Sequence, residues 1–404
     1  MDGRYRLAVL TRRVVLLLLA DLVSTTGTEM TAVALPWLVL VTTGSPVRTG
    51  LVLAAELLGL AACGLPGGAL LQRLGPRRTL LLADGGRALA VGLVPVLNRA
   101  GGLSFAVLLA VAFVLGAPFA AHQAARQSAL AGLSGDDEHQ LTRLGGLLSA
   151  ANEGASTIGP VLGGLLVALL GADGVLVLDA GSYLVAVALV AVALPELVGT
   201  LTTARVREGL SWLAHDRPLR RLIGGLCVLQ VSFTALVLLV PVLARTQYGG
   251  GAATAGLLLG AYGLGSVVGG LVSARGWALG PPGRAVWGLA LTLLPVVLTP
   301  PAWGLALCLA GHGYFSGLVY PRLFAALALR PPEALRAHVQ TAAVTTLSIP
   351  GPLGFVGAGL LLEGRGPTPA LIMVAVIAVA GAVVAGRATP ANAPPDEAAP
   401  ALRA

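Results

Sequence analysis

Two apolar runs separated by a short basic turn form the stretch GGALLQRLGPRRTLLLADGGRAL at residues 67–89. The turn at 73–78 carries three arginines, and an acid and a base, Asp84 and Arg87, stand inside the second apolar run. Apolar runs of about 20 residues are long enough to cross the core of a bilayer as helices. The stretch therefore predicts two membrane spans joined by a tight basic turn.

The same character extends over the whole chain. Of its 404 residues, 56% are hydrophobic and only 11% are charged, whereas soluble domains carry about 25% charged residues. Mean hydropathy is +0.86, and alternating apolar and polar strands of the kind found in transmembrane barrels are absent from the sequence. The composition predicts an all-α integral membrane protein whose main partner is the lipid bilayer.

The formal charge of +8 does not indicate nucleic-acid binding. Aromatic residues make up 4% of the chain, and the basic residues stand in short turns between apolar runs. No stripe of basic and aromatic residues is available to track a phosphate backbone. We therefore expect no nucleic-acid partner, and we interpret the arginines as topology signals.

Twelve apolar runs are long enough to be membrane spans. They lie near 14–41, 50–71, 79–98, 102–122, 143–170, 174–194, 220–244, 253–274, 285–299, 302–327, 338–362 and 368–387. With this division, Arg48, Arg99, Arg245 and Arg365 fall on one face and Arg87 within a span, while the remaining arginines, Arg126 among them, fall on the face of the N-terminus. We expect the protein to lie in the cytoplasmic membrane. The positive-inside rule then places both termini on the cytoplasmic side.

The longest polar stretch between spans, 196–219, divides the chain into halves of six spans. We expect an N-terminal six-helix bundle at 1–195, a cytoplasmic linker at 196–219, a C-terminal six-helix bundle at 220–388 and a disordered tail at 389–404. Within and just beyond the linker, REGLSWLAHDRPLRRL (207–222) predicts a short amphipathic helix at the membrane surface.

The two halves resemble each other weakly. IGPVLGGLLVALLG (158–171) and PGPLGFVGAGLLLEGRG (350–366) both contain Gly-Pro, then small residues, then a Gly-Leu-Leu run that ends in glycine. Repeated halves about a central loop are typical of transporters. The fold class predicted is two pseudo-symmetric six-helix bundles.

These motifs resemble those of the major facilitator superfamily, and most closely its multidrug and siderophore efflux branch. In that family, the turn between the second and third spans carries a signature of glycines and arginines that is followed by an acid and an arginine. The residues that match it here, and to which the resemblance gives gating roles, are Gly68, Arg73, Gly75, Arg77, Arg78, Asp84 and Arg87. One position departs from the signature, because Gln72 stands where the family has an aspartate that helps to hold the halves together.

A second motif lies in the fifth span. ASTIGPVLGG (155–164) resembles the family's antiporter motif, which is associated with exporters, although its first glycine is alanine here. The resemblance implies a packing and gating role for Gly159, Pro160, Gly163 and Gly164. Glycines also allow close approach of membrane helices.

Acidic residues inside the spans are the candidate proton- or substrate-binding groups. An ionised side chain at the bilayer centre costs about 2.5–3.5 kcal/mol, so such residues normally face a cavity or a partner. Asp21, Thr25 and Glu29 recur every four residues and predict a polar stripe on the first span. This stripe can either line a central cavity or satisfy neighbouring helices.

Three further residues are candidates. Asn152 and Glu153 form a polar patch at the start of the antiporter-like motif, where cavity lining and helix–helix hydrogen bonding are both open. Glu56 has no polar neighbour one turn away and needs a partner on another helix. Asp84 and Arg87 are three residues apart, close enough to form a pair on one helix, and we interpret them as a gating pair.

We therefore predict a secondary transporter that exports a hydrophobic or amphipathic small molecule by proton antiport with alternating access. Burial favours the protonated form of a carboxyl group, which makes a membrane glutamate a suitable proton carrier. No cofactor or metal is expected beyond the proton gradient, and we expect a monomer. The alternatives are a facilitator-fold uptake or lipid carrier without proton-coupled efflux, and a membrane-embedded enzyme or sensor, for which the sequence offers no catalytic motif.

Overall fold

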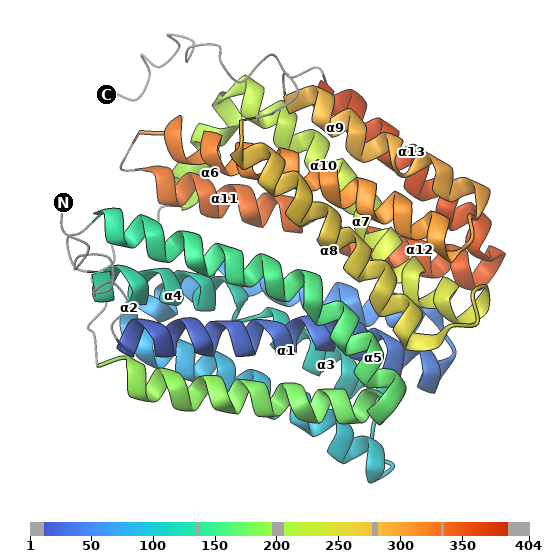
Figure 1. Ribbon diagram of the computed structural model, residues 1–404, viewed down its shortest axis with the longest axis horizontal. Coiled ribbons are helices and arrows are strands. Elements are labelled where there is room, and N and C mark those ends of the chain that lie inside the picture. Colours follow the sequence, from blue (N-terminus) through green and yellow to red (C-terminus); the bar gives the residue numbers. More distant parts are fainter. Residues whose placement is uncertain (1–11, 135–137, 196–205, 277–281, 333–334, 387–404) are drawn as a thin grey trace.

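The computed structural model describes residues 12–134, 138–195, 206–276, 282–332 and 335–386. These residues are helical almost throughout (Figure 1). We refer to α1–α5 as the N half and to α6–α13 as the C half. The N half contains α1 (Arg12–Thr43), α2 (Pro46–Arg99), α3 (Phe105–Gly116), α4 (Phe119–Ser134) and α5 (Glu138–Ala193).

The C half begins with a short helix and continues with longer ones. Its elements are α6 (Val206–His215), α7 (Arg217–Thr246), α8 (Gly251–Ala274), α9 (Pro282–Leu291), the 3-10 helix η2 (Leu294–Leu298), α10 (Ala302–Leu329), α11 (Arg336–Ser348), α12 (Gly351–Arg365) and α13 (Pro367–Gly386). The amphipathic helix expected at 207–222 is α6, which ends at His215 because Asp216 caps the next helix by accepting from the Leu219 amide at 3.0 Å.

The expected number of spans is present among the described residues. Ten helices are long and apolar enough to cross a bilayer. One of them, Arg143–Ala193, is divided by Gly171 into two segments, and Arg284–Leu298 adds a shorter apolar helix. Gly75 and Gly171 break α2 and α5 at φ of 74° and 75°, which a residue with a side chain adopts only at a cost. The tight turn predicted within 73–78 is therefore confirmed at Gly75.

The prediction for the fourth span was too short. Helix is present in α3 and then, after a turn at 117–118, in α4 as far as Ser134, twelve residues beyond the expected end at 122. The continuation contains His122, Gln123 and Arg126, which look like loop residues in the sequence. They are helical because their polar groups find partners inside the N half, as described below.

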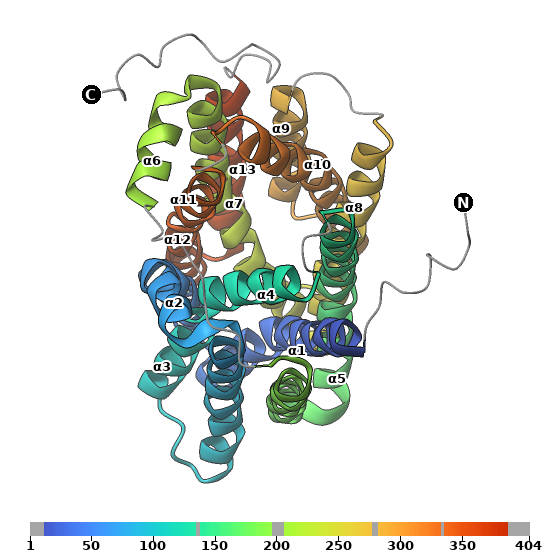
Figure 2. The ribbon, with the colours of Figure 1, turned by 90° about the vertical axis from the view of Figure 1, so that its left-hand side faces the viewer.

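We name the two ends of the bundle by the helices that end there. The terminal end is where α1 begins and α13 ends; the loop end is where α1, α7 and α12 end. Figure 2 views the molecule from the terminal end, and the ribbons of α4 and α10 stand well apart there. The strongest contacts between the halves join α5 to α8 and α2 to α12.

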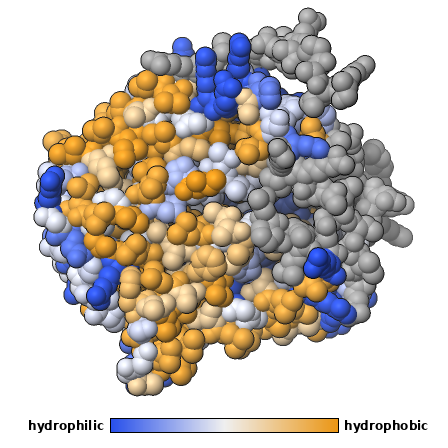
Figure 3. All heavy atoms as spheres, turned by 180° about the vertical axis from the view of Figure 1, so that it is seen from behind, coloured by the Kyte–Doolittle hydropathy of each residue, from blue (hydrophilic) through white to orange (hydrophobic). Residues whose placement is uncertain are grey.

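The surface fits a bilayer environment. Large apolar side chains are exposed along most helices, for example Leu89, Leu169 and Trp303 at 78%, 78% and 70%. Figure 3 shows one face covered mostly by apolar residues, with hydrophilic ones gathered near its margins. In water such a surface would be unfavourable, whereas lipid chains solvate it.

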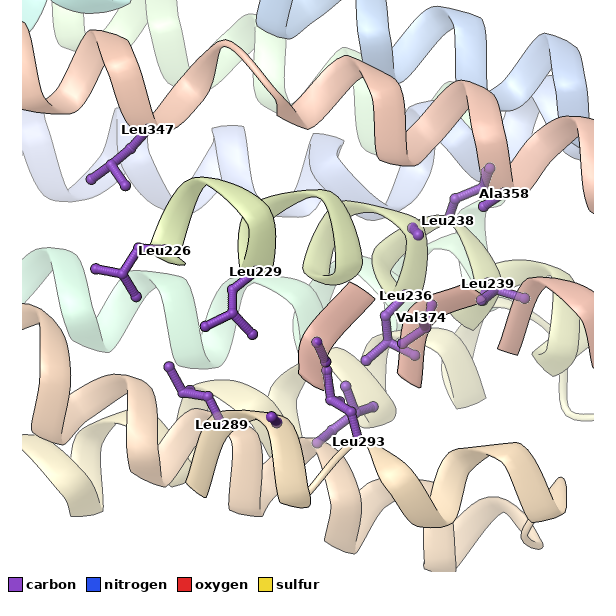
Figure 4. Packing of buried hydrophobic residues seen from close by; sticks show 14 of the residues in the cluster. Leu226, Leu229, Leu236, Leu238, Leu239, Leu289, Leu293, Leu347, Ala358 and Val374 are labelled. Carbon is purple, nitrogen blue, oxygen red and sulfur yellow. The ribbon is translucent and has the colours of Figure 1, made fainter. Parts of the chain in front are cut away.

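Leucine packing fills the C half. Leu226, Leu229 and Leu236 of α7 face Leu289 and Leu293 near the end of α9 (Figure 4). All five of these leucines are at most 4% exposed. Three residues of the N half, Leu40, Leu53 and Ala54, join the same apolar cluster, so the core of the C half continues into the interface between the halves.

Glycines set the spacing of α8 and α10. A Cβ atom at Gly313 would lie 1.9 Å from the Tyr262 carbonyl oxygen, and one at Gly269 would lie 2.0 Å from the Tyr314 carbonyl oxygen. The two backbones are therefore in direct contact, as small residues allow between membrane helices.

We expect Gly313→Ala to lower the unfolding free energy by about 1–3 kcal/mol, since a backbone must move to admit the methyl group. Gly270→Ala is the matched control, because a Cβ atom there has no neighbour within 4 Å. The measurement is thermal unfolding of both purified variants in detergent. Equal melting temperatures for the two variants would contradict this account of the α8–α10 contact.

Candidate functional site

A buried ion pair occupies the terminal-end half of the polar stripe on α1. Arg126 of α4 donates to Asp21 Oδ1, and the two residues are 7% and 4% exposed. The Arg126 guanidinium also donates to the Gln123 side chain. The sequence placed Arg126 among the cytoplasmic arginines, which is wrong, because this side chain points into the N half and neutralises Asp21.

Asn152 of α5 completes this network. With its side-chain amide oriented to suit both neighbours, the nitrogen donates to Asp21 Oδ2 at 2.9 Å and the oxygen accepts from Arg126 Nη1 at 3.1 Å. The Thr25 hydroxyl lies 3.4 Å from the same amide. Three of the predicted residues, Asp21, Thr25 and Asn152, therefore lie together, and Asp21 has partners on two neighbouring helices.

Glu29 has a different environment. Its carboxylate accepts from Ser156 of α5 at 2.8 Å, and no cation pairs with it among the described residues. Its side chain is half-buried, and the neighbouring Glu153 on α5 is exposed although it stands well inside a membrane-spanning helix. These two carboxylates are close enough to influence each other electrostatically.

The geometry of the α1–α5 contact explains how Glu29 is held. A Cβ atom at Gly159 would lie 2.4 Å from Glu29 Cβ, and one at Gly163 would lie 2.8 Å from the Met30 backbone. A larger residue at either of these two positions would force α1 away from α5. Gly159 and Gly163 of the antiporter-like motif thus set the position of Glu29.

Two other residues of that motif, Pro160 and Gly164, join the two halves of the molecule. A Cβ atom at Gly164 would lie 2.5 Å from the Ala252 carbonyl oxygen of α8, and one at Gly256 would lie 2.4 Å from the Pro160 carbonyl oxygen. The α5 and α8 backbones therefore touch at the loop-end side of Glu29, and the contact consists of small residues.

Asp84 and Arg87 do not form the pair that their spacing suggests. Asp84 Oδ1 lies 3.2 Å from His122 Nε2 of α4. Arg87 instead donates from Nε to the Leu115 carbonyl at 3.2 Å and stacks over the Tyr183 ring at 5.9 Å. Each side chain finds a partner on another helix, because the two point toward different neighbours.

A small cavity connects the two charged groups of the N half. Its lining includes Asp21, Asp84, His122 and Arg126, together with apolar residues of α1, α2 and α5. Asp84 of the signature and Asp21 of the α1 stripe thus meet beside α4. The sequence does not mark His122 and Arg126 as site residues, because both lie near the cytoplasmic end predicted for span four, where arginines between apolar runs indicate topology.

The basic turn of the signature lies at the terminal end. Gly75 has the positive φ that the turn requires, Arg77 donates to the Ala191 carbonyl at 3.1 Å, and Arg73 and Arg78 are exposed. The surroundings of Gly68 and the side chain of Gln72 fall outside the described part of the chain. The effect expected from the missing acid at position 72 therefore stays a prediction.

Glu56 lies near the loop-end half of the site. Within the part of the chain that the structure describes, no hydrogen bond or ion pair to its carboxylate is found, but Arg87, Glu29 and Asp179 are within electrostatic reach. Asp179, by contrast, is fully buried and accepts from Thr31 at 2.5 Å and Ser182 at 3.1 Å. This places Asp179 in a structural network.

The C half contributes three rings in mutual contact. Phe233 of α7 lies 4.9 Å from Tyr262 of α8 and 5.6 Å from His312 of α10, centroid to centroid. The imidazole is anchored by a 3.0 Å hydrogen bond between Nδ1 and the Leu289 carbonyl. Tyr262 adjoins Gly263, which packs against Thr157 of α5, and it is within electrostatic reach of Glu29 and Glu153. Tyr262 is therefore the ring of this group that lies toward the carboxylates of the N half.

We expect Asp21→Asn to lower the unfolding free energy by about 3–5 kcal/mol, because it leaves the Arg126 charge buried without its counter-ion. The double variant Asp21→Asn with Arg126→Gln should lose less than the two single variants together. Thermal unfolding of the four proteins in detergent measures this coupling. Strict additivity would show that the pair is not a unit.

Comparisons with solved structures agree with this architecture. The D-xylose-proton symporter aligns with a TM-score of 0.72 at 15% identity, covering 93% of this chain and 97% of that chain. A bacterial homologue of the human lysosomal transporter Spinster, in an inward-facing and unoccupied conformation, aligns with a TM-score of 0.69 at 15% identity and covers 93% and 96%. Identities this low establish the fold alone.

Sequence comparisons give the family. The multidrug efflux pump Tap of Mycolicibacterium fortuitum is 28% identical over 374 residues, covering 87% of this chain and 89% of that protein. The pump Tap of Mycobacterium tuberculosis (strain ATCC 25618 / H37Rv) is 28% identical over 382 residues, covering 89% and 90%. The model of the Major Facilitator Superfamily matches residues 17–277. The chain therefore belongs to the Major Facilitator Superfamily, as a multi-pass membrane protein and secondary transporter of small molecules rather than an enzyme.

Proposed function

We propose that this transporter exports a hydrophobic or amphipathic small molecule across the cytoplasmic membrane in exchange for protons. The observation that carries the proposal is the state of Glu29, a membrane carboxylate that is half-buried, hydrogen-bonded only to Ser156 and without a cation among the described residues. Such a group can take up and release a proton without breaking an ion pair. The similarity to the Tap efflux pumps supports the outward direction.

Asp21 is less suited to carry the proton. Its carboxylate is held by Arg126 and Asn152, so protonation would leave a buried guanidinium without its counter-ion. We therefore give Asp21, Thr25 and Asn152 a positioning role, in which they hold α1, α4 and α5 together. Glu29 is then the carrier, and Glu153 is a second acid that disfavours having both groups ionised.

The site suits an amphipathic substrate. Tyr262 of the C half is within electrostatic reach of Glu29 and Glu153, its ring lies 4.9 Å from that of Phe233, and both rings are only partly buried. Aromatic faces bind apolar and cationic groups, and a carboxylate provides charge complementarity for a cation. A molecule with an apolar body and a basic group would contact both halves at once. A proton and the basic group of this molecule would then compete for the Glu29 carboxylate.

The arginine distribution suggests which way the protein faces. The terminal end carries Arg73, Arg77 and Arg78, whereas Arg48, Arg245 and Arg365 are at the loop end. We place the terminal end in the cytoplasm by the positive-inside rule. Since the closest contacts between the halves are at the loop end, the conformation is then inward-facing, and transport requires the loop end to open.

We expect Glu29→Gln to abolish efflux driven by an imposed pH gradient in proteoliposomes, because the amide cannot carry a proton. Asp173→Asn is the control, since this acid accepts from Asn98 at the loop end, away from the site. Efflux of a fluorescent amphipathic cation, followed with and without a protonophore, is the measurement. Unchanged gradient-driven efflux by the Glu29→Gln protein would refute proton carriage by this residue.

Comparison of inverted and right-side-out vesicles separates the alternatives. Accumulation by inverted vesicles alone supports export. Net flux in the opposite direction, or flux that ignores the pH gradient, would instead favour an uptake or lipid carrier without proton coupling. The wild-type protein is sufficient for this test, so its outcome does not depend on the choice of Glu29.

A further inference from the structure

The turn between α1 and α2 is bound by two charged residues of the C half. Glu363, in the last turn of α12, accepts from the Ser45 hydroxyl at 2.5 Å and from the Val47 amide at 3.3 Å. Arg245, in the last turn of α7, donates from Nη1 to the Leu40 carbonyl at 2.5 Å. No motif in the sequence marks either residue.

The two charges match the helix termini that they contact. Ser45 is the N-cap of α2, and Val47 is the second residue of that helix, so Glu363 lies at a terminus with unpaired amides and partial positive charge. Leu40 is in the last turn of α1, where its carbonyl also accepts from Gly44, so Arg245 lies at a terminus with partial negative charge. The C half thus places an acid and a base on opposite poles of one helical hairpin.

The backbones around these contacts are close enough to exclude lipid. A Cβ atom at Gly50 would lie 2.5 Å from the Phe355 carbonyl oxygen, and one at Gly359 would lie 3.0 Å from the Val47 Cα. Small residues therefore let α2 and α12 meet, and the polar contacts lie at the edge of this surface. Glu363 is exposed, so its interaction with the terminus of α2 is of modest strength and reversible.

We propose that Leu40, Ser45, Val47, Arg245 and Glu363 form a gate at the loop end, which we call the loop-end gate. Glu363 and Arg245 hold the closed state by capping helix termini of the opposite half, and both contacts break when the loop end opens. The proposal rests on the alternating access proposed above. It assigns the closing force to helix termini rather than to a salt bridge between the halves, so each charged residue acts without an oppositely charged side-chain partner.

The test is the distance between spin labels across the gate, measured by pulsed electron paramagnetic resonance. The labels replace the exposed Val96 of α2 and Leu360 of α12, in a background where Cys63, Cys227 and Cys308 are alanine. A second pair at exposed positions toward the terminal end, Leu82 and Leu329, reports the opposite motion.

We expect Glu363→Ala and Arg245→Ala each to raise the ratio of open to closed loop end by about fivefold, with the terminal-end pair moving closer. Glu363→Gln, which keeps the side-chain volume, should give a smaller shift in the same direction. Ser45→Ala should add little to Glu363→Ala, because the two residues share one contact.

Arg365→Ala is the matched control, since this exposed residue is two positions from Glu363 and, among the described residues, has no hydrogen bond or ion pair to the N half. Unchanged distances in Glu363→Ala, Glu363→Gln and Arg245→Ala would overturn the gate, and so would an equal shift in Arg365→Ala. The measurement uses neither substrate nor pH gradient. Failure of the proposed export would therefore appear in the vesicle assays and leave this result unaffected.

Discussion

A charge inside a bilayer needs a partner within the protein, and the N half is arranged around this requirement. Asp21, Arg126 and Asn152 come from three different helices and neutralise or satisfy one another. Lipid chains offer no hydrogen bonds, so the free energy of the buried pair depends on all three helices staying in register. The network therefore fixes the arrangement of α1, α4 and α5, and with it the position of Glu29 about two turns beyond Asp21.

The second constraint is the distance between helices. Lipid tails are as apolar as leucine, so helices in a membrane associate through close packing rather than through hydrophobic burial. Gly159 and Gly163 fix α1 on α5 within the N half, while Gly164 and Gly256 bring α5 to α8 across the halves. The same kind of close contact therefore holds helices together within the N half and across the two halves.

Sequence reasoning identified the elements better than the partners. Hydropathy located the spans, and the glycine at position 75 indicated the turn between two of them. Both signals depend only on the local sequence. It failed at α4, where polar residues that pair inside the bundle look like a loop, and Arg126 was assigned to the surface for the same reason. It also paired Asp84 with Arg87, since helical spacing does not show which way each side chain turns.

The sequence by itself determined that this is a membrane protein of two helical halves, because apolar length and arginine placement act locally against a uniform bilayer. It also determined which residues carry charge in the membrane. Only the tertiary structure decided which of those charges have a counter-ion and which have none in the described part of the chain. Asp21 and Glu29 lie on the same stripe of α1, but Asp21 pairs with Arg126 of α4, whereas Glu29 accepts from Ser156 of α5. The same holds for Glu363 and Arg245, whose role depends on helix termini that are more than 200 residues away along the chain.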